Sequence, residues 1–302
     1  MNSPRDARVN QTANRPMNKT EPVRDGSRAI GAILVEQGRL NPSDVDEILR
    51  YAVAHSLRFG DAALHMRLIT QSDIDAAVAQ QFNYPILSRG GEYGVAADVV
   101  SAYLPQSPLL EPLRAVRSQL ILRWLNGANR RILAVASPER GEGRSWLAAN
   151  LATMFAQLGE RTLLIDADMR HPRQHELFHF ANTVGLSSLL TGRAGREIAR
   201  RIHPQLRLFV LSAGMMPPNP QELLERQVFD VVLDHFAEQY SIIVIDTPAM
   251  SETADAQIIA SRAGAALMLA RRNHTRQSPL TAAMQSLGQP GVNIIGSVLS
   301  EH

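Results

Sequence analysis

The chain has 302 residues, 45% of them hydrophobic, which is enough for one large domain or two smaller ones with a sizeable core. It has no cysteine, which excludes disulfides and thiolate chemistry, and its formal net charge of +2 gives no reason to expect a nucleic-acid partner. No apolar run approaches the roughly 20 residues of a membrane span, and the N-terminus lacks the apolar core of a signal peptide. We therefore expect a soluble, intracellular protein.

The N-terminal third of the chain divides into a polar tail and a repeat. Residues 1–27 have almost no large apolar side chains and are predicted to be disordered. Residues 28–88 repeat with a period of 29, so that Asn41-Pro-Ser-Asp-Val-Asp46 matches Thr70-Gln-Ser-Asp-Ile-Asp75 and Gly38 matches Arg67. Asn41 and Thr70 are predicted helix caps. The repeat predicts two helix-turn-helix units that pack on each other.

The rest of the chain has the pattern of an α/β protein. Residues 89–110 are rich in glycine and proline and are interpreted as a linker. In residues 111–302, apolar strand candidates alternate with helical stretches; they are 132–136, 162–166, 207–211, 242–246, 265–270 and 293–299. This alternation predicts a doubly wound, mostly parallel sheet.

A glycine loop at residues 137–145, Ser-Pro-Glu-Arg-Gly-Glu-Gly-Arg-Ser, stands between the first strand and a helix, which is the layout of a phosphate-binding loop. Gly141 and Gly143 let backbone N–H groups curl around a phosphate, and the helix start adds its positive end. Ser145 is the candidate Mg²⁺ ligand. Arg144 replaces the usual lysine but keeps a charge that can bind phosphate. A glycine-rich turn that only precedes a helix is the alternative interpretation.

Two later strands end in carboxylates. Asp166 and Asp168 end the strand in Leu163-Leu-Ile-Asp-Ala-Asp-Met-Arg170, and Asp246 ends the strand in Ile242-Ile-Val-Ile-Asp-Thr-Pro248. Ligands of doubly wound sheets bind at the carboxyl ends of the strands, so we expect all three side chains near the glycine loop. Structural capping of the following turns is the alternative role.

In this order, the three motifs resemble those of the bacterial tyrosine kinases of capsule and exopolysaccharide synthesis, in the P-loop superfamily of the MinD and ParA ATPases. The stretch 163–170 is similar to the family's additional acidic motif, and 242–248 to its Walker B motif. Glu111, Arg114 and Arg117 match the motif through which subunits of the family form a ring. The resemblance covers 111–302 and is strongest to the EpsG-type subgroup associated with chain-length determinants, where a loop ending in Arg-Ser also occurs.

The resemblance implies an ATP-dependent protein-tyrosine kinase that regulates exopolysaccharide chain length and export, with ATP and Mg²⁺ as cofactors. It implies catalytic roles for Asp166, Asp168 and Arg144, and metal-binding roles for Ser145, Asp166 and Asp246. The implied nucleotide-binding residues are Gly141, Glu142, Gly143, Arg144, Ser145 and Trp146. The implied partners are further copies of the chain, in a homo-oligomer, and a membrane chain-length determinant, a polysaccharide co-polymerase. That partner would hold this cytoplasmic chain at the inner membrane.

Two departures from the family pattern leave alternatives open. The five tyrosines are Tyr51, Tyr84, Tyr93, Tyr103 and Tyr240, and none lies in the last sixty residues, where the family carries its phosphorylated tyrosine cluster. The acceptor is then another tyrosine or another protein; otherwise the domain is a MinD-like or ParA-like ATPase switch, or a non-catalytic nucleotide-binding regulator. The last strand also ends in Ser300, where relatives often place asparagine.

The N-terminal repeat resembles the N-terminal domain of type II secretion and pilus ATPases, some of which bind cyclic di-GMP through Arg-x-Gly-rich motifs. The two copies read Arg28-Ala-Ile-Gly31 and Arg58-Phe-Gly60 here, and Arg67 replaces an expected glycine. We interpret the repeat as a docking or packing module, with cyclic di-GMP binding as the alternative.

Overall fold

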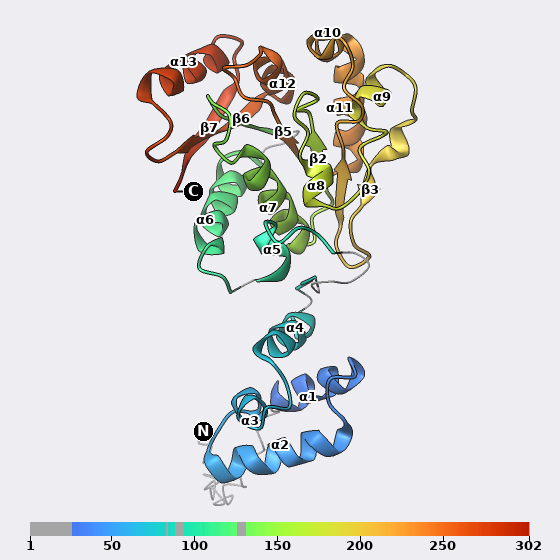
Figure 1. The fold of residues 1–302 in the computed structure, drawn as a ribbon, viewed down its shortest axis with the longest axis vertical. Helices are drawn as coiled ribbons and strands as arrows, with labels where there is room; N and C mark the ends of the chain where they lie inside the picture. Colours follow the sequence, from blue (N-terminus) through green and yellow to red (C-terminus); the bar gives the residue numbers. More distant parts are fainter. Residues whose placement is uncertain (1–25, 83, 88–93, 105, 126–130, 302) are drawn as a thin grey trace, which may run out of the picture. The chain divides into compact units, whose positions relative to one another are not determined.

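The structure is a computed structural model that describes residues 26–82, 84–87, 94–104, 106–125 and 131–301. The chain divides into two compact units, Met1–Gln81 and Phe82–His302, each of which is described by itself (Figure 1). Except for Gly26 and Ser27, the segment 1–27 that was predicted to be disordered lies outside the described residues.

The helices of the first unit follow the period seen in the sequence. They are α1 (Gly26–Glu36), α2 (Pro42–His55), α3 (Phe59–His65) and α4 (Gln71–Gln81), so that α2 and α4 begin 29 residues apart and α1 and α3 end 29 residues apart. Leu34, Ile48 and Phe59 are buried in their shared core. Two short helical pairs thus bury one another's apolar faces, which neither could do alone.

Both copies of the repeat begin their second helix with the same polar contact. The Asn41 N–H donates to Asp44 Oδ2 at 2.8 Å, and the Thr70 N–H donates to Asp73 Oδ2 at 2.9 Å. The Thr70 hydroxyl adds a second bond to that carboxylate, at 2.6 Å. Each aspartate therefore satisfies an N–H group at the helix start and places negative charge at the positive end of the helix.

The turn between the helices of each copy has the same backbone geometry with different residues. Gly38 has φ 68°, and its counterpart Arg67 has φ 57°. Arg39 N–H bonds to Leu34 O in one turn, and Leu68 N–H bonds to Ala63 O in the other. Arg67 is thus held in the left-handed region by the turn around it, although a side chain with a Cβ disfavours that region.

The second unit is built on a seven-stranded sheet in the order β3-β4-β2-β5-β1-β6-β7, in which every pairing is parallel except β3 with β4. The strands are β1 (Ile132–Ala136), β2 (Thr162–Asp166), β3 (Arg200–Arg201), β4 (Leu208–Leu211), β5 (Ile242–Asp246), β6 (Ala265–Arg271) and β7 (Asn293–Ser300). The predicted α/β class, with a doubly wound, mostly parallel sheet, is confirmed. The edge strand β3 was not predicted, because two exposed arginines carry no strand pattern.

Helices cover both faces of this sheet (Figure 1). Alternate strand residues face opposite layers: Leu133 and Val135 pack with α7, whereas Ala134 and Ala136 pack with α12. The first layer contains α5 (Val100–Tyr103), α6 (Leu110–Leu120), its π-helical continuation η1 (Ile121–Leu125), α7 (Arg144–Gln157) and α8 (Gln174–Leu177). The second layer contains α9 (Leu186–Leu190), the 3₁₀ turn η2 (Arg196–Ile198), α10 (Pro220–Glu225), α11 (Gln227–Gln239), α12 (Asp255–Ala263) and α13 (Gln277–Gly288).

The described part of the range 89–110, which was predicted to be a linker, is packed structure that includes α5. Val95, Val99 and Ala102 are buried in the core on the α7 side of the sheet. The Ser101 N–H donates to Asn150 Oδ1 of α7 at 3.0 Å. The glycines and prolines around this stretch led to the linker prediction. The helix α5 was missed because its four residues are too few to show a helical period. In the part of the chain that the structure describes, no helix has the length and apolar composition needed to cross a membrane.

The paired turns of the first unit predict opposite effects for two substitutions. Gly38→Ala is expected to destabilise the unit by about 1 kcal/mol, because alanine disfavours positive φ, and no neighbouring atom lies within 4 Å of the added Cβ. Arg67→Gly is expected to stabilise the unit by a few tenths of a kcal/mol. The free energy gained by relieving the backbone strain exceeds the entropic cost of ordering a glycine on folding. Hydrogen exchange of residues 30–81 in the full chain measures both. Equal effects of the same sign would contradict the shared geometry.

Candidate functional site

The loop between β1 and α7 has the backbone of a phosphate-binding loop. Gly141 and Gly143 have φ values of 81° and 97°, in the region that glycine occupies without strain. Arg144 follows as the first residue of α7, a helix of 14 residues. The unpaired N–H groups and the positive end of this helix therefore open at the loop, where an anion binds favourably.

Arg144 is almost fully buried and spans from this loop to the end of β5. Its Nε donates to Thr247 O at 2.9 Å, and its Nη1 donates to Glu139 O at 2.6 Å and to the Ser137 hydroxyl. Thr247 directly follows Asp246, and its own hydroxyl donates to Val135 O at 2.8 Å. The guanidinium thus holds a fixed positive charge across the loop and ties the loop to β5.

The side chains of Glu142 and Trp146 face the protein. Glu142 is fully buried: its Oε2 accepts the Glu139 N–H at 2.8 Å, and its Oε1 accepts the hydroxyl of Thr275, in the loop after β6. Arg271 Nη1 donates to Gly141 O at 3.2 Å from the same region. Trp146 packs against the core on the α7 side. These two side chains therefore support the loop, and Glu142 would contact a nucleotide phosphate only through its backbone N–H.

The carboxylates of β2 and β5 lie beside each other. Asp166 and Asp246 are paired in register on adjacent parallel strands, and both are fully buried. Neighbouring strands are roughly 5 Å apart, so the two carboxylates share one buried space. The expectation that these strand ends approach the glycine loop agrees with the bonds of Arg144 to the residue after Asp246.

Asp166 and Asp168 also organise the loop that follows β2. Asp166 Oδ2 accepts the N–H groups of Arg173 and Gln174, both at 2.9 Å, and its Oδ1 accepts the Asp168 N–H at 3.2 Å. Asp168 Oδ1 accepts the His171 N–H at 2.8 Å. The capping role considered for this pair is thus present. Asp168 remains 7% exposed, whereas Asp166 is enclosed.

Burial makes the charged form of both strand-end carboxylates unfavourable. Desolvation raises the pKa of Asp246 to about 6, although the Ser145 hydroxyl, the Gln174 amide and the Arg144 guanidinium lower it. Desolvation, followed by repulsion from Asp246, raises the pKa of Asp166 well above its ordinary value. A divalent cation bound here would relieve both effects, because it favours the charged carboxylates.

The residues present fit Mg²⁺ bound together with a phosphate. Asp246 Oδ1 is buried and has no hydrogen-bond partner among the described residues, whereas both oxygens of Asp166 accept backbone N–H groups. Within the described ranges, no three His, Cys, Asp or Glu side chains come together as a metal cage. Mg²⁺ commonly binds through one or two protein oxygens, phosphate and water, so Asp246 and Ser145 are the better placed of the predicted ligands.

Two contacts of this site involve side chains outside the predicted set. Gln174 is fully buried, and its Nε2 donates to Asp246 Oδ2 at 2.7 Å and to Ser145 O at 3.1 Å. Arg170 Nε lies 3.2 Å from Asp255 Oδ2, in a salt bridge that fixes the end of the acidic motif. No sequence signal marks Gln174, since a polar residue beside charged neighbours is typical of an exposed loop.

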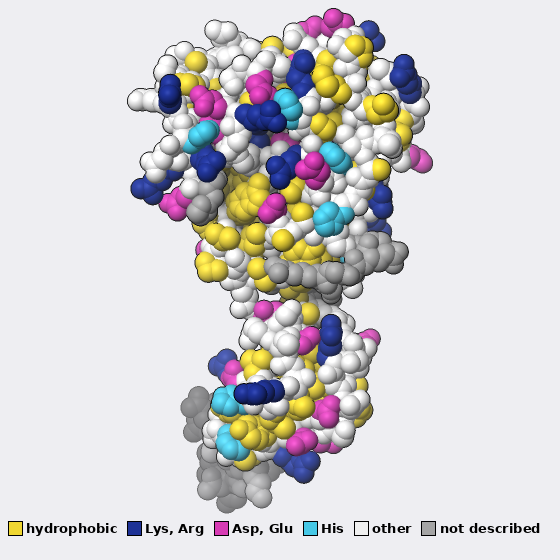
Figure 2. All heavy atoms as spheres, viewed as in Figure 1, with side chains coloured by type: hydrophobic (Ala, Val, Ile, Leu, Met, Phe, Trp, Pro, Cys, Tyr) yellow, Lys and Arg dark blue, Asp and Glu magenta, His cyan; other side chains and the backbone are white. Residues whose placement is uncertain are grey.

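The rim of the site is charged. Arg140 Nη1 lies 3.3 Å from His171 Nε2, and His171 Nδ1 lies 3.6 Å from Glu252. On the face of the second unit seen in Figure 2, basic, acidic and histidine side chains are interspersed. This face therefore presents mixed charge.

The three residues of the predicted oligomerisation motif lie on α6. Glu111 and Arg114 form an ion pair of 2.9 Å near its start, with 77% of the Glu111 side chain exposed. Arg117 turns inward instead, and its Nη1 donates to Met154 O of α7 at 3.4 Å. Glu111 is therefore available at the surface, Arg114 is half-buried beside it, and Arg117 links two helices of the same chain.

Comparison with known proteins gives a consistent set of relatives. No protein-family model matches the chain. It is 33% identical over 198 residues to CapB of Staphylococcus aureus, described as a candidate tyrosine-protein kinase; the match covers 65% of this chain and 86% of CapB. It is 32% identical over 203 residues to the tyrosine-protein kinase YwqD of Bacillus subtilis, covering 67% of this chain and 85% of YwqD.

Solved structures give the same relationship. The kinase domain of the Escherichia coli tyrosine kinase Etk matches with a TM-score of 0.66 and 29% identity, over 71% of this chain and 83% of that domain. The chimerical protein CapA2B2 matches with a TM-score of 0.64 and 30% identity, over 74% of this chain and 97% of the chimera.

The buried pair of carboxylates predicts that the site lowers the stability of the metal-free protein. Because folding raises the pKa of Asp246, the folded state binds this proton more tightly than the unfolded chain does. This contribution to stability is present below pH 4 and is lost as the pH rises through about 6. Asp246→Asn is therefore expected to raise the melting temperature in EDTA at pH 7.5, by an amount that shrinks toward pH 4.

A second variant, at a buried carboxylate that has a positively charged partner, tests whether the missing partner causes the effect. Asp255 is buried but paired with Arg170, so Asp255→Asn removes an attraction and is expected to lower the melting temperature under the same conditions. Differential scanning calorimetry measures both. A lower melting temperature for Asp246→Asn at pH 7.5 would contradict the argument that the buried, charged carboxylate destabilises the metal-free fold.

Proposed function

The chain belongs to the bacterial tyrosine-protein kinases, and we propose that it transfers the γ-phosphoryl group of ATP to a protein tyrosine in the control of exopolysaccharide chain length and export. The observation that carries this proposal is the joining of three elements at one sheet edge. Arg144 links the glycine loop to β5, and Gln174 links β5 to the start of α7. Phosphate-binding backbone, a fixed cation and buried carboxylates thereby face one site.

In this proposal the protein mainly positions the phosphates and neutralises their charge. Backbone N–H groups at 141–145 and the start of α7 bind the phosphates. Arg144 stabilises the charge that develops on the γ-phosphoryl group. Ser145 and Asp246 would hold Mg²⁺, with Asp166 beside them, and the cation when bound offsets negative charge on the phosphates.

Asp168 is the proposed acceptor for the tyrosine proton. It is the more exposed carboxylate of the acidic loop, and its position is set by backbone N–H groups of the turn. The tyrosine oxygen bonds to the γ-phosphorus, the bond from that phosphorus to the bridging oxygen breaks, ADP leaves and the phenolic proton passes to Asp168. Each atom and charge of the transfer is then accounted for.

The tyrosines of this chain favour a separate protein as the substrate. Tyr103 and Tyr240 are buried, and the Tyr84 hydroxyl donates to Gln157 Oε1 at 2.8 Å. Tyr51 is half-buried on α2 and stacks on His55, while Tyr93 lies outside the described residues. To be phosphorylated, Tyr84, Tyr103 or Tyr240 would have to break its existing contacts. A tyrosine on a flexible segment of another protein reaches the site directly.

The proposed assembly follows the family resemblance. A membrane chain-length determinant would bind the chain at the cytoplasmic face of the inner membrane and activate it. Further copies of the chain would associate through α6, where 77% of the Glu111 side chain is exposed.

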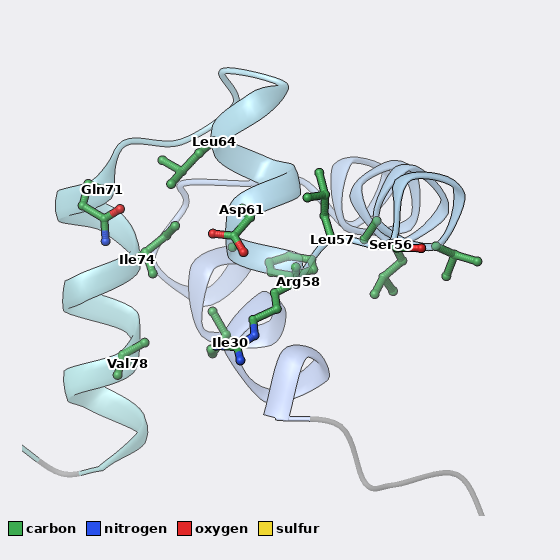
Figure 3. Close-up of a pocket in the computed structure, with 14 residues that line it drawn as sticks. Ile30, Ser56, Leu57, Arg58, Asp61, Leu64, Gln71, Ile74 and Val78 are labelled. Atoms are coloured by element: carbon green, nitrogen blue, oxygen red, sulfur yellow. The ribbon is translucent and has the colours of Figure 1, made fainter.

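For the first unit we favour docking over cyclic di-GMP binding. A cavity of about 740 Å³ is lined by residues of α1, α2, α3 and α4, and Figure 3 shows its mainly aliphatic lining. Arg58 and Asp61 are the charged residues that line it, so a dianionic ligand would meet an opposing carboxylate. The other residue of the proposed nucleotide motif, Arg28, lies where side chains are not described.

Phosphotyrosine formation tests the proposed function. Purified protein, [γ-³²P]ATP, Mg²⁺ and a cytoplasmic fragment of the membrane partner are expected to yield phosphotyrosine, mapped by phosphopeptide analysis. Asp168→Asn is expected to lower the rate at least 100-fold, because the proton acceptor is lost. Asp230→Asn, which alters a carboxylate paired with Arg262 at the surface, is the matched control and should keep its activity.

Two other outcomes would replace the proposal. Phosphate release without phosphotyrosine would identify an ATPase switch. ATP binding with neither product would identify a non-catalytic regulator.

A further inference from the structure

Gln174 lies at the junction of the three elements that build the site, and its backbone is fixed there by Asp166. It is the first residue of α8, just beyond the acidic loop, and it is fully buried. The N–H groups of Arg173 and Gln174 both donate to Asp166 Oδ2 at 2.9 Å. The carboxylate at the end of β2 therefore determines where the Gln174 side chain begins.

The side-chain amide of Gln174 has one acceptable orientation. Its Nε2 lies 2.7 Å from Asp246 Oδ2 and 3.1 Å from Ser145 O, and both of these atoms are acceptors. Exchanging the amide oxygen and nitrogen would place an acceptor against two acceptors. Both N–H hydrogens are consequently used, and Oε1 must point away from these two bonds.

Two buried acceptors then remain for a ligand. Gln174 Oε1 and Asp246 Oδ1 each have no hydrogen-bond partner among the described residues. Because Gln174 occupies Oδ2 of Asp246, it determines which oxygen of that carboxylate is left over. Buried acceptors are usually paired, and hydrated Mg²⁺ supplies both a positive charge and water O–H donors.

The neutrality of glutamine matters at this position. An arginine or lysine would also hold Asp246, but its charge would compensate the carboxylate and compete with a cation. A hydrocarbon side chain would leave Asp246 Oδ2 and Ser145 O without a donor. Glutamine orients the carboxylate and leaves its negative charge available.

We propose that Gln174 is a positioning residue for the divalent cation: its amide N–H groups orient Asp246 and the start of α7, and its Oε1 accepts a hydrogen bond from cation-bound water. This inference rests on the proposed function, because it assumes that Mg²⁺ and a nucleotide bind at this site. Partners of this kind around metal ligands commonly change metal affinity by about 10- to 100-fold.

The test measures cation dependence and needs no kinase activity. Binding of a fluorescent ADP analogue to the full chain is titrated with Mg²⁺, and binding is measured again in EDTA. Gln174→Met keeps the side-chain length and the backbone bond to Asp166 but removes the amide. It is expected to raise the Mg²⁺ concentration for half-maximal effect at least tenfold, with little change in the affinity measured in EDTA.

Gln157→Met is the matched control. Gln157 is also buried in this unit, and its Nε2 donates to Pro85 O at 3.1 Å and to Ser101 O at 2.8 Å, at the opposite end of α7 from Ser145. The control removes a buried amide whose N–H groups also donate two hydrogen bonds, and it is expected to lower stability without moving the Mg²⁺ midpoint. An equal shift in both variants would reduce Gln174 to a structural role.

The outcomes separate this inference from the proposed function. If the wild-type protein binds no Mg²⁺-dependent nucleotide, the proposed function fails; if it does and Gln174→Met has the same Mg²⁺ midpoint, the inference alone fails. Should the variant not fold, a crystal structure of the wild-type complex with Mg²⁺ and ADP decides. Gln174 bonded to Asp246 and to a cation-bound water is expected there, and an amide turned away from both overturns the inference.

Discussion

The burial of two neighbouring carboxylates, Asp166 and Asp246, is the constraint around which this site is built. The parallel register of β2 and β5 places both carboxylates side by side with no exposure to solvent. Each is tolerated only because nearby donors are supplied: backbone N–H groups of the acidic loop for Asp166, and the Gln174 amide for Asp246. These donors are uncharged dipoles, and the positive charge beside them is that of the Arg144 guanidinium. Negative charge therefore remains for a cation to bind.

The arginine in the glycine loop follows from the same arrangement. A lysine at position 144 would be a point charge on one nitrogen, whereas the guanidinium directs Nε to Thr247 O and Nη1 to Glu139 O. Arg144 therefore joins two strand ends and contributes charge at the same time. Glu142 and Thr275 brace the loop from the β6 side. The departure from the common lysine is accompanied by acceptors placed to receive each bond.

The first unit shows how strongly a repeat imposes its geometry. Arg67 adopts the backbone conformation of Gly38 because the helices before and after it are held by equivalent caps and equivalent core contacts. Gly31 packs against Val45, and Gly60 packs against Ile74, which is the counterpart of Val45 one period later. The packing of four short helices thus overrides the local preference of one residue.

The apolar runs, and the polar and glycine residues that end them, determined the central strands, the glycine loop and the order of the motifs. These features depend on residues that are neighbours along the chain. The strands β1, β2 and β5 begin and end where the apolar runs 132–136, 162–166 and 242–246 place them. Tertiary structure alone decided which strands adjoin, that Asp166 faces Asp246 and that Gln174 reaches across to both Asp246 and Ser145. It also turned Glu142 and Arg117 inward and packed residues 94–104 onto α7. Such contacts join residues tens of positions apart, and local sequence pattern carries no record of them.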